Sequence, residues 1–478
     1  MGAPASDVSA AAGSKLTLSC TAPTGSTVVA IVGNQSVTLQ EEGKSSGRKD
    51  YTAAVYSGSV TLPAAAEGEI YSLGTITYRA SRGNESAIIR GADVRVMGSG
   101  AVIPVEVTRD HAELKLGYNT WYYDDFTPQV AGMRDYAVSQ ANGYYLLRVG
   151  GYIAQTNVRE LDAGTEIDIA AIRQIAVGTA EGNTVILIDA KNTIPMNGYC
   201  ENGIFYLSLY NVDTSWTGEI LMRDNPLFTK AAWAKSTKAN SIKLALTLRD
   251  PANFYGFEFD YAEGGMTLVY LRNPQVLPDS DTPLTGKTIV LDAGHGGSDS
   301  GAIGPQGAGS GIAAVDEADL NLAITLAAAE ELRRLGANVI LTRDADVTVD
   351  INARVILLDE LEPDLSISIH QNSMPYSTDI TRVRGLVGLY YADAGRLLTE
   401  CVSASTAAAL NRYERDPAEQ RLALCRNARF PSTLIEVGFI TCVEEYEKMQ
   451  NADVIAATGE AIAQGVLDYY AAQAQWAT

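Results

Sequence analysis

Two of the three histidines in this chain occupy positions from which an imidazole can do chemistry. His295 lies in the stretch DAGHGG, directly after an apolar run, and His370 closes the run LSISIH. Both runs predict β-strands, and functional groups in open α/β sheets gather beyond the carboxyl ends of the strands. One histidine at a strand end is more often structural, but two at equivalent ends favour a functional pair. The glycines after His295 keep its ring accessible.

Carboxylates are the second group of candidate functional residues. Asp316, Glu317 and Asp319 stand at the start of a predicted helix, where acidic residues commonly complement the helix dipole. Glu436 lies in the strongly apolar run STLIEVGFI. A carboxylate is costly to bury there without a cation or a chemical role, although a salt-bridged or edge-exposed glutamate is the alternative.

Two histidines, one carboxylate and an open position are typical of a catalytic zinc site. Such a metal lowers the pKa of a bound water to about 7, and a second carboxylate can then take up and return a proton. The separations between His295, Glu317 and His370 match no short helical signature such as HExxH, so the spacing is weak support. Chemistry alone also leaves the choice between Asp316 and Glu317 open.

The elements that must position these residues alternate between strand and helix after a proline-containing linker at Pro274–Pro283, where we place the main domain boundary. Alternation of this kind indicates an α/β domain with a mostly parallel sheet flanked by helices. The expected strands are 288–294, 338–344, 365–370 and 431–440, and the expected helices are 321–336, 406–413 and 456–473.

Residues 1–277 have a different character. They are rich in Thr, Val, Tyr, Gly and Asn, and short alternating runs such as SKLTLSC and TVILIDA predict an all-β region. Gly- and Pro-containing breaks divide this region into three modules, which we place at 1–100, 101–162 and 163–277, each long enough for a small sandwich or barrel.

Composition restricts the class of protein. The chain has 478 residues, with 36 Lys+Arg against 57 Asp+Glu and a net charge of −21, which makes it a poor binder of nucleic acid. No window approaches the roughly 18–20 consecutive apolar residues of a membrane span. The opening MGAPASDVSAAAGSK lacks the basic and apolar regions of a signal peptide, so we expect a cytosolic protein or a mature form.

The cysteines are too sparse for a disulfide framework or a CxxC zinc set. We expect them to be small buried side chains, with one disulfide among the last three as the alternative. They are Cys20, Cys200, Cys401, Cys425 and Cys442.

The C-terminal part resembles a known family, the zinc-dependent N-acetylmuramoyl-L-alanine amidases of the amidase-3 type. The matching stretches, within about residues 286–475, are IVLDAGHGGSDSGAIGPQG, DEADLNLAITLAAAEELRRLGANVILTRDAD, DLSISIHQNS and LCRNARFPSTLIEVGFI.

This resemblance implies that His295, Glu317 and His370 hold Zn2+ and that Glu436 is the catalytic general base. Glu317 is preferred over Asp316 because it matches the pattern E-x-D-x-N-L. The implied reaction is hydrolysis of the amide between the lactyl group of muramic acid and the L-alanine of the stem peptide. Ala293 replaces the family's usual proline, and Thr441-Cys442 replaces a common Ser-Asn pair, but neither change touches the four reactive positions.

The β modules also carry resemblances. Residues 101–162 are similar to bacterial SH3-like wall-binding domains, residues 163–277 look like the AMIN-type β-sandwich that often precedes amidases, and residues 1–100 suggest an immunoglobulin-like module. His111 is expected to be structural. The aromatic candidates for binding the wall are Trp121, Tyr122, Tyr123, Tyr144 and Tyr145.

Together these features predict a monomeric, secreted or wall-associated enzyme with peptidoglycan as its partner; a protein activator is left open. A zinc peptidase acting within the stem peptide and a non-catalytic wall-binding protein are the alternatives. Only about fifteen residues separate His370 from the next strand, GLVGLYY. We therefore expect no inhibitory helical insertion there, because so short a connection cannot form a helix and both of its linkers.

Overall fold

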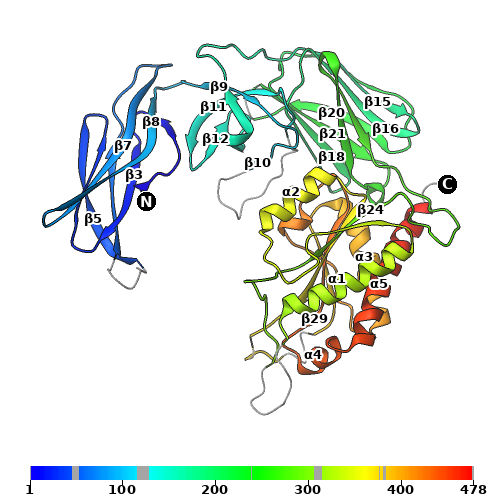
Figure 1. Ribbon diagram of the computed structural model, residues 1–478. Coiled ribbons are helices and arrows are strands. Elements are labelled where there is room, and N and C mark those ends of the chain that lie inside the picture. Colours follow the sequence, from blue (N-terminus) through cyan, green and yellow to red (C-terminus); the bar gives the residue numbers. More distant parts are fainter. Residues whose placement is uncertain are drawn as a thin grey trace. The chain divides into compact units, whose positions relative to one another are not determined.

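The computed structural model describes residues 2–45, 53–115, 129–237, 240–305, 315–375, 377–379 and 384–475 (Figure 1). The chain forms two compact units, Met1–Asp168 and Ile169–Thr478. The linker at Pro274–Pro283, where we expected the main boundary, therefore lies inside the second unit. No helix among the described residues is long and apolar enough to cross a membrane.

The first unit is built from strands, as expected for this region. Apolar side chains from several of these strands pack together in a buried core, which includes Leu18, Tyr56, Ile76 and Val94. The strands are β1 (Gly2–Ala3), β2 (Val8–Ala11), β3 (Lys15–Pro23), β4 (Thr27–Val32), β5 (Gln35–Ser45), β6 (Ala53–Thr61), β7 (Ile70–Arg82), β8 (Glu85–Met97), β9 (Ile103–Val107), β10 (Leu114–Lys115), β11 (Arg134–Ala141), β12 (Tyr144–Leu147), β13 (Tyr152–Ala154) and β14 (Val158–Glu160), with a short helix η1 (Gln155–Asn157).

The segments 1–100 and 101–162 share one hydrogen-bonded sheet. Strand β2 pairs in parallel with β8 and antiparallel with β11, and thereby joins the two segments. Beside this join, Arg95 of β8 pairs with Glu160 of β14 at 2.5 Å. Arg95 and Glu160 therefore link the two segments 1–100 and 101–162, which we expected to be separate modules.

The aromatic side chains of this unit have a different role from the one that we expected for some of them. Tyr145 is buried, and its hydroxyl donates to Glu160 at 2.6 Å, so the expectation that it binds the wall is wrong. Tyr144 is half-buried, with Lys115 5.8 Å from the centre of its ring. Trp121, Tyr122 and Tyr123 lie outside the described residues.

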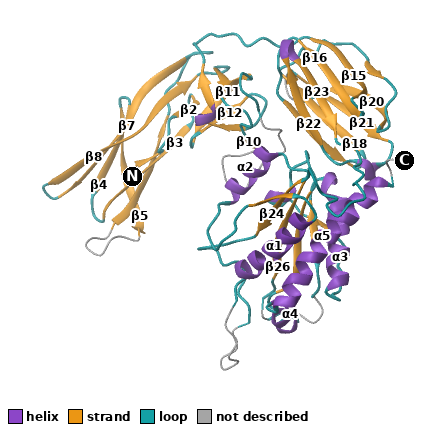
Figure 2. Ribbon diagram, turned by 45° about the vertical axis from the view of Figure 1, so that its right-hand side comes forward, coloured by secondary structure: helices purple, strands orange, loops and turns teal. Residues whose placement is uncertain are grey.

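The second unit begins with two sheets that pack face to face around a shared apolar core (Figure 2). All of their pairings are antiparallel except that of β15 with β19, which is parallel. The five-stranded sheet has the order β19-β15-β16-β23-β22, and the four-stranded sheet has the order β17-β18-β21-β20. The elements are β15 (Ile172–Ala180), β16 (Asn183–Ala190), β17 (Met196–Glu201), β18 (Ile204–Tyr210), β19 (Ile220–Met222), β20 (Phe228–Lys235), β21 (Ser241–Leu248), η2 (Pro251–Asn253), β22 (Phe257–Ala262), η3 (Glu263–Gly265) and β23 (Met266–Leu271).

An α/β domain follows, with the sheet order β25-β24-β26-β29-β27-β28. Every pairing is parallel except that of β27 with β29. The elements are β24 (Thr288–Ala293), α1 (Glu317–Arg334), β25 (Asn338–Leu341), α2 (Ile351–Leu361), β26 (Leu365–Asn372), β27 (Val387–Tyr390), α3 (Asp393–Ala409), β28 (Ala418–Glu419), η5 (Ala423–Cys425), β29 (Ser432–Phe439), α4 (Val443–Met449) and α5 (Ala452–Ala474).

Helices cover both faces of this sheet. Helices α1, α3 and α5 share an apolar core with alternate residues of β24, β26 and β29, including Leu291, Ile367 and Ile435. Helix α2 packs on the opposite face, where Leu358 contacts Val290. Helix α2 was not expected from the sequence. Of the expected helix 406–413, only residues 406–409 are helical, and they form the end of α3. All five cysteines are free, so the alternative of a disulfide is not realised.

The sandwich of β15–β23 packs directly on the α/β domain. Ala394, in the first turn of α3, is buried in the core of the sandwich. The backbone N–H of Phe257 donates to the carbonyl of Arg429 at 3.0 Å, and Arg272 donates to the carbonyl of Pro363 at 3.0 Å. These contacts make the sandwich and the α/β domain one compact unit.

Candidate metal centre

His295 stands at the carboxyl end of β24 in a tightly turned loop. Its φ is +60°, and the backbones of Gly296 and Asp299 exchange two hydrogen bonds, at 2.8 and 3.2 Å. The turn brings the Asp299 carboxylate to 2.9 Å from His295 Nδ1. A carboxylate can only accept, so Nδ1 carries a proton and Nε2 faces away from Asp299.

Glu317 is the first residue of α1 and is buried. The backbone N–H groups of Ala302 and Gln371 donate to its two carboxylate oxygens, at 2.9 and 3.2 Å. Asn321, one turn further along α1, donates to the same carboxylate at 3.3 Å. The helix N-terminus and these donors fix an ionised carboxylate in one orientation.

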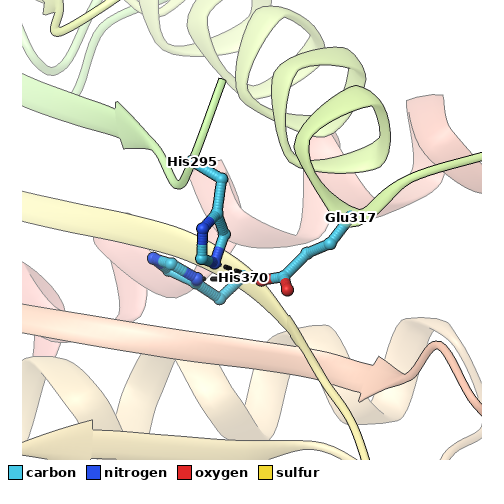
Figure 3. Close-up of side chains that lie close together, drawn as sticks. All are labelled: His295, Glu317 and His370. Atoms are coloured by element: carbon cyan, nitrogen blue, oxygen red, sulfur yellow. Dashed lines mark hydrogen bonds and ion pairs between the residues drawn. The ribbon is translucent and has the colours of Figure 1, made fainter. Parts of the chain in front are cut away.

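The three expected ligands come together at this point. His295 Nε2 lies 3.2 Å and His370 Nδ1 lies 2.9 Å from Glu317 Oε1, and the candidate ligand atoms all lie within 4.8 Å of one another (Figure 3). The two rings meet edge to face, with centroids 5.0 Å apart. A Cβ on Gly294 would lie 2.2 Å from His370 Cε1, so only glycine allows the His370 ring this close.

The ionisation of the cluster matches a site for a cation. Hydrogen bonding to Glu317 raises the pKa of His295 to about 9, against the opposing effect of burial. Burial would raise the pKa of Glu317, but hydrogen bonds from both histidines outweigh it and hold that pKa well below its usual range. The carboxylate is therefore charged, and positive charge is favoured where the three side chains converge.

Glu436 is the cross-strand neighbour of His370, since β26 and β29 pair in parallel with these two residues in register. Burial raises the pKa of Glu436 to about 7. Within the part of the chain that the structure describes, its Oε2 is buried without a hydrogen-bond partner. A buried carboxyl oxygen left open in this way is unusual and is typical of functional sites.

Two arginines that the sequence did not single out hold the loop of His295 in place. Arg343 donates to the carbonyls of Gly294 and Ala318 at 2.9 and 2.8 Å, which ties the loop to the first turn of α1. Arg354 forms a buried ion pair with Asp292 and donates to the His295 carbonyl at 2.7 Å. These contacts join residues 25 to 62 positions apart in the sequence and so leave no local pattern.

The other acidic candidates lie outside the cluster. Asp316 is the N-cap residue of α1 without a side-chain capping bond, and Asp319 is exposed in the first turn. His111 belongs to the first unit. Between β26 and β27, the described residues 373–375, 377–379 and 384–386 form no helix, and the rest of this connection lies outside the described residues.

The donor set fits a divalent metal of the zinc type. Two imidazole nitrogens and one carboxylate converge, and a further carboxylate with an open oxygen stands on the neighbouring strand. Three protein ligands with room for a fourth are typical of catalytic metal sites. Fold and site together define an α/β domain with the donor set of a metal-dependent hydrolase at the carboxyl end of its sheet.

Comparison with known proteins agrees with this class. The N-acetylmuramoyl-L-alanine amidase family matches residues 289–468. Protein YqiI of Bacillus subtilis is 31% identical over 188 residues, which cover 39% of this chain and 87% of that protein. The N-acetylmuramoyl-L-alanine amidase LytC of the same organism is 30% identical over 188 residues, 39% of this chain and 36% of LytC, so the chain matches about a third of that relative's length.

Among solved structures, the N-acetylmuramoyl-L-alanine amidase AmiC2 of Nostoc punctiforme is similar, with 33% identity, coverage of 39% of this chain and 98% of that chain, and a TM-score of 0.35. Given the match over residues 289–468 and the coverage of YqiI, the chain belongs to the N-acetylmuramoyl-L-alanine amidase family.

Proposed function

We propose that this amidase depends on zinc, held by His295, Glu317 and His370. The observation that carries the proposal is the convergence of these three side chains within 4.8 Å, next to the open carboxyl oxygen of Glu436. Bound there, zinc would polarise the scissile carbonyl and lower the pKa of a water molecule. The Asp299 carboxylate keeps His295 Nε2 turned toward the site, and the donors around Glu317 keep that side chain charged.

Glu436 is the proton carrier in this proposal. Its burial and its place beside His370 suit a carboxylate that takes a proton from the attacking water and then gives it to the leaving nitrogen. The substrate is peptidoglycan, and the bond is the amide between the muramic acid lactyl group and L-alanine. The family membership of residues 289–468 supports this choice of bond.

The β region has a tethering role in the same proposal. Residues 1–100 act as an immunoglobulin-like module, 101–162 as an SH3-like module and 163–277 as an AMIN-like sandwich, and they hold the enzyme on the cell wall outside the cytoplasm. Their content of strands supports this assignment. Tethering raises the local substrate concentration even when each contact is weak. With a net charge of −21, the contacts must be specific hydrogen bonds and stacking.

Mass spectrometry of the fragments released from purified peptidoglycan tests this function. With zinc, we expect free stem peptides with an L-alanine amine terminus and glycan without peptide, and we expect neither after chelation. Shortened peptides that remain on muramic acid would show that the enzyme is a peptidase and not an amidase. If the protein binds the wall but releases nothing under either condition, the proposed activity is wrong.

A further inference from the structure

Two buried amide side chains lie next to the candidate metal ligands without belonging to them. Asn321 lies one turn after Glu317 in α1 and is fully buried. Gln371 follows His370 in β26 and is only 2% exposed. The Nε2 group of Gln371 donates to Asn321 Oδ1 at 3.3 Å. The two amides therefore form one hydrogen-bonded pair inside the α/β domain.

This amide pair joins the three segments of the chain that carry the ligands. Asn321 Nδ2 donates to the Gly294 carbonyl and to Glu317 Oε1, both at 3.3 Å. Gly294 directly precedes His295. The backbone N–H of Gln371 donates to the same oxygen of Glu317, at 3.2 Å. The end of β24, the first turn of α1 and the end of β26 are thus held together by two neighbouring amides.

The hydrogen bonds allow only one orientation of each amide. The Gly294 carbonyl and the ionised Glu317 can only accept, so the NH2 group of Asn321 must face them. Its Oδ1 then faces Gln371, which must present its own NH2 group there and turn its Oε1 away. Within the described part of the chain, this Oε1 is buried without a hydrogen-bond partner. Gln371 therefore uses its donor and leaves its acceptor unpaired.

The unpaired oxygen indicates that Gln371 does not serve the stability of the fold. A buried acceptor without a partner lowers the free energy of unfolding, and an apolar side chain of similar size would avoid that loss. The hydrogen bond that Gln371 does make reaches Asn321, which in turn contacts a candidate ligand. Partners of this kind, one step removed from the metal, orient the ligands and strengthen binding.

We propose that Gln371 is a positioning residue of the metal centre and acts through Asn321. It holds the Asn321 amide in one orientation, and Asn321 holds the Glu317 carboxylate in the position that a cation requires. Ligands that are fixed before the metal arrives lose less conformational freedom on binding, so the metal binds more tightly. This inference rests on the proposed zinc site and adds a residue that is not itself a ligand.

The zinc affinity of Gln371→Met, measured on the full chain by competition with a calibrated chelator, tests the proposal. Methionine is also long and unbranched but offers no donor to Asn321. We expect zinc affinity to fall about tenfold, as is usual for partners that orient ligands. The urea midpoint of the metal-free protein should equal that of the parent. One unpaired buried acceptor, Gln371 Oε1, is exchanged for another, Asn321 Oδ1.

The matched control is Thr325→Val. Thr325 lies one turn beyond Asn321 in α1, and its hydroxyl is also buried with no partner among the described residues. Valine removes that polar atom and leaves the amide pair intact, so zinc affinity should equal that of the parent. In an Asn321→Leu background, Gln371→Met should change zinc affinity by less than about twofold, because the residue through which Gln371 acts is absent.

Three results would overturn the role of Gln371. They are an unchanged zinc affinity of Gln371→Met, an equal loss of affinity with and without Asn321→Leu, and a lowered urea midpoint of the metal-free variant, which would indicate a general loosening of the fold. If the parent binds zinc and Gln371→Met binds it as tightly, only the positioning role is wrong. If the parent binds no zinc, the proposed metal site is wrong, and this inference with it.

Discussion

The two ends of the strands β24, β26 and β29 differ in how their polar groups are satisfied. At the amino ends, Lys287 pairs with Asp364, the same carboxylate accepts from the Thr288 N–H at 2.8 Å, and the hydroxyls of Ser366 and Ser432 bond to each other at 2.9 Å. At the carboxyl ends, two imidazoles and a carboxylate converge on one point, and Glu436 keeps an open oxygen.

This difference separates what the fold needs from what the site needs. Paired ions and hydroxyls at the amino ends complete the packing of the strands. At the carboxyl ends, Arg343 and Arg354 hold the loop of His295, whose backbone is in the left-handed conformation. Together with backbone N–H groups, they keep ionisable side chains in place around the candidate metal centre. The same strands therefore serve stability at one end and chemistry at the other, as is general for open α/β sheets.

The largest effect should follow from Glu436→Gln, which keeps the shape of the side chain and removes the proton carrier. We expect turnover on peptidoglycan to fall by about 10²–10⁴-fold, the usual contribution of general acid–base catalysis. Initial rates of stem-peptide release give the measurement. Glu460→Gln, on the exposed face of α5, is the matched control and should keep full activity. Activity of Glu436→Gln within threefold of the parent would remove Glu436 from the mechanism.

Asp299→Asn should weaken the affinity for zinc by about 10–100-fold, as is usual for the partners that orient metal-ligating histidines. An asparagine N–H can donate to His295 Nδ1 and so favour the tautomer whose proton sits on Nε2, where the metal should bind. Competition with a calibrated chelator measures the affinity. Asp319→Asn, an exposed change in the first turn of α1, should leave it unaltered, and equal affinities for all three proteins would refute the role of Asp299.

Asp292→Asn should destabilise the fold by about 3–5 kcal/mol at pH 7, because it leaves Arg354 buried without its counter-charge. Burial raises the pKa of Asp292, but Arg354 and the hydroxyls of Ser368 and Thr342 outweigh it and hold this pKa below its usual range. The stabilisation is therefore complete above about pH 4, the pKa of an unfolded aspartate, and is lost as the pH falls further. Urea unfolding at pH 7, 4 and 3 should show a gap between the two proteins that narrows with acid; a gap that widens would contradict the ion pair.

The smallest effect is expected at the amino end of β24, where Asn338 of the neighbouring strand β25 contacts Thr288. Asn338→Ala removes an exposed hydrogen bond to the Thr288 hydroxyl, at 3.3 Å, and should cost about 0.5–1 kcal/mol. Urea unfolding and stem-peptide release together measure it, and turnover should equal that of the parent. A loss of turnover as large as that expected from Glu436→Gln would contradict the contrast between the two ends.

Local sequence was enough for the parts of the site that lie in short motifs. The runs around His295, His370 and Glu436 predicted strands, and the structure has them there, with Glu317 opening α1. The pairing of Asp292 with Arg354, 62 positions apart, could not be predicted, since side chains that meet only after folding leave no periodic signal. Helix α2 was missed because Ile351, Val355 and Ile356 are β-branched and favour strand, whereas its N-cap, Asp350, supports the helix that forms.

The packing of the sandwich on the α/β domain was equally hidden from the sequence. The prolines at Pro274–Pro283 indicated a boundary, and they do separate two folds along the chain. The contacts of Ala394, Phe257 and Arg272 nevertheless bring both folds into one unit. Composition marks where a fold ends along the chain, but complementary surfaces decide what it packs against.

The zinc content of three proteins, the parent, Glu436→Gln and His370→Ala, tests the central assignment most directly. After exhaustive dialysis and measurement by plasma mass spectrometry, we expect one zinc per chain in the parent and in Glu436→Gln, and almost none in His370→Ala. Zinc retained by His370→Ala, or lost from Glu436→Gln, would contradict the division of these residues into metal ligands and proton carrier.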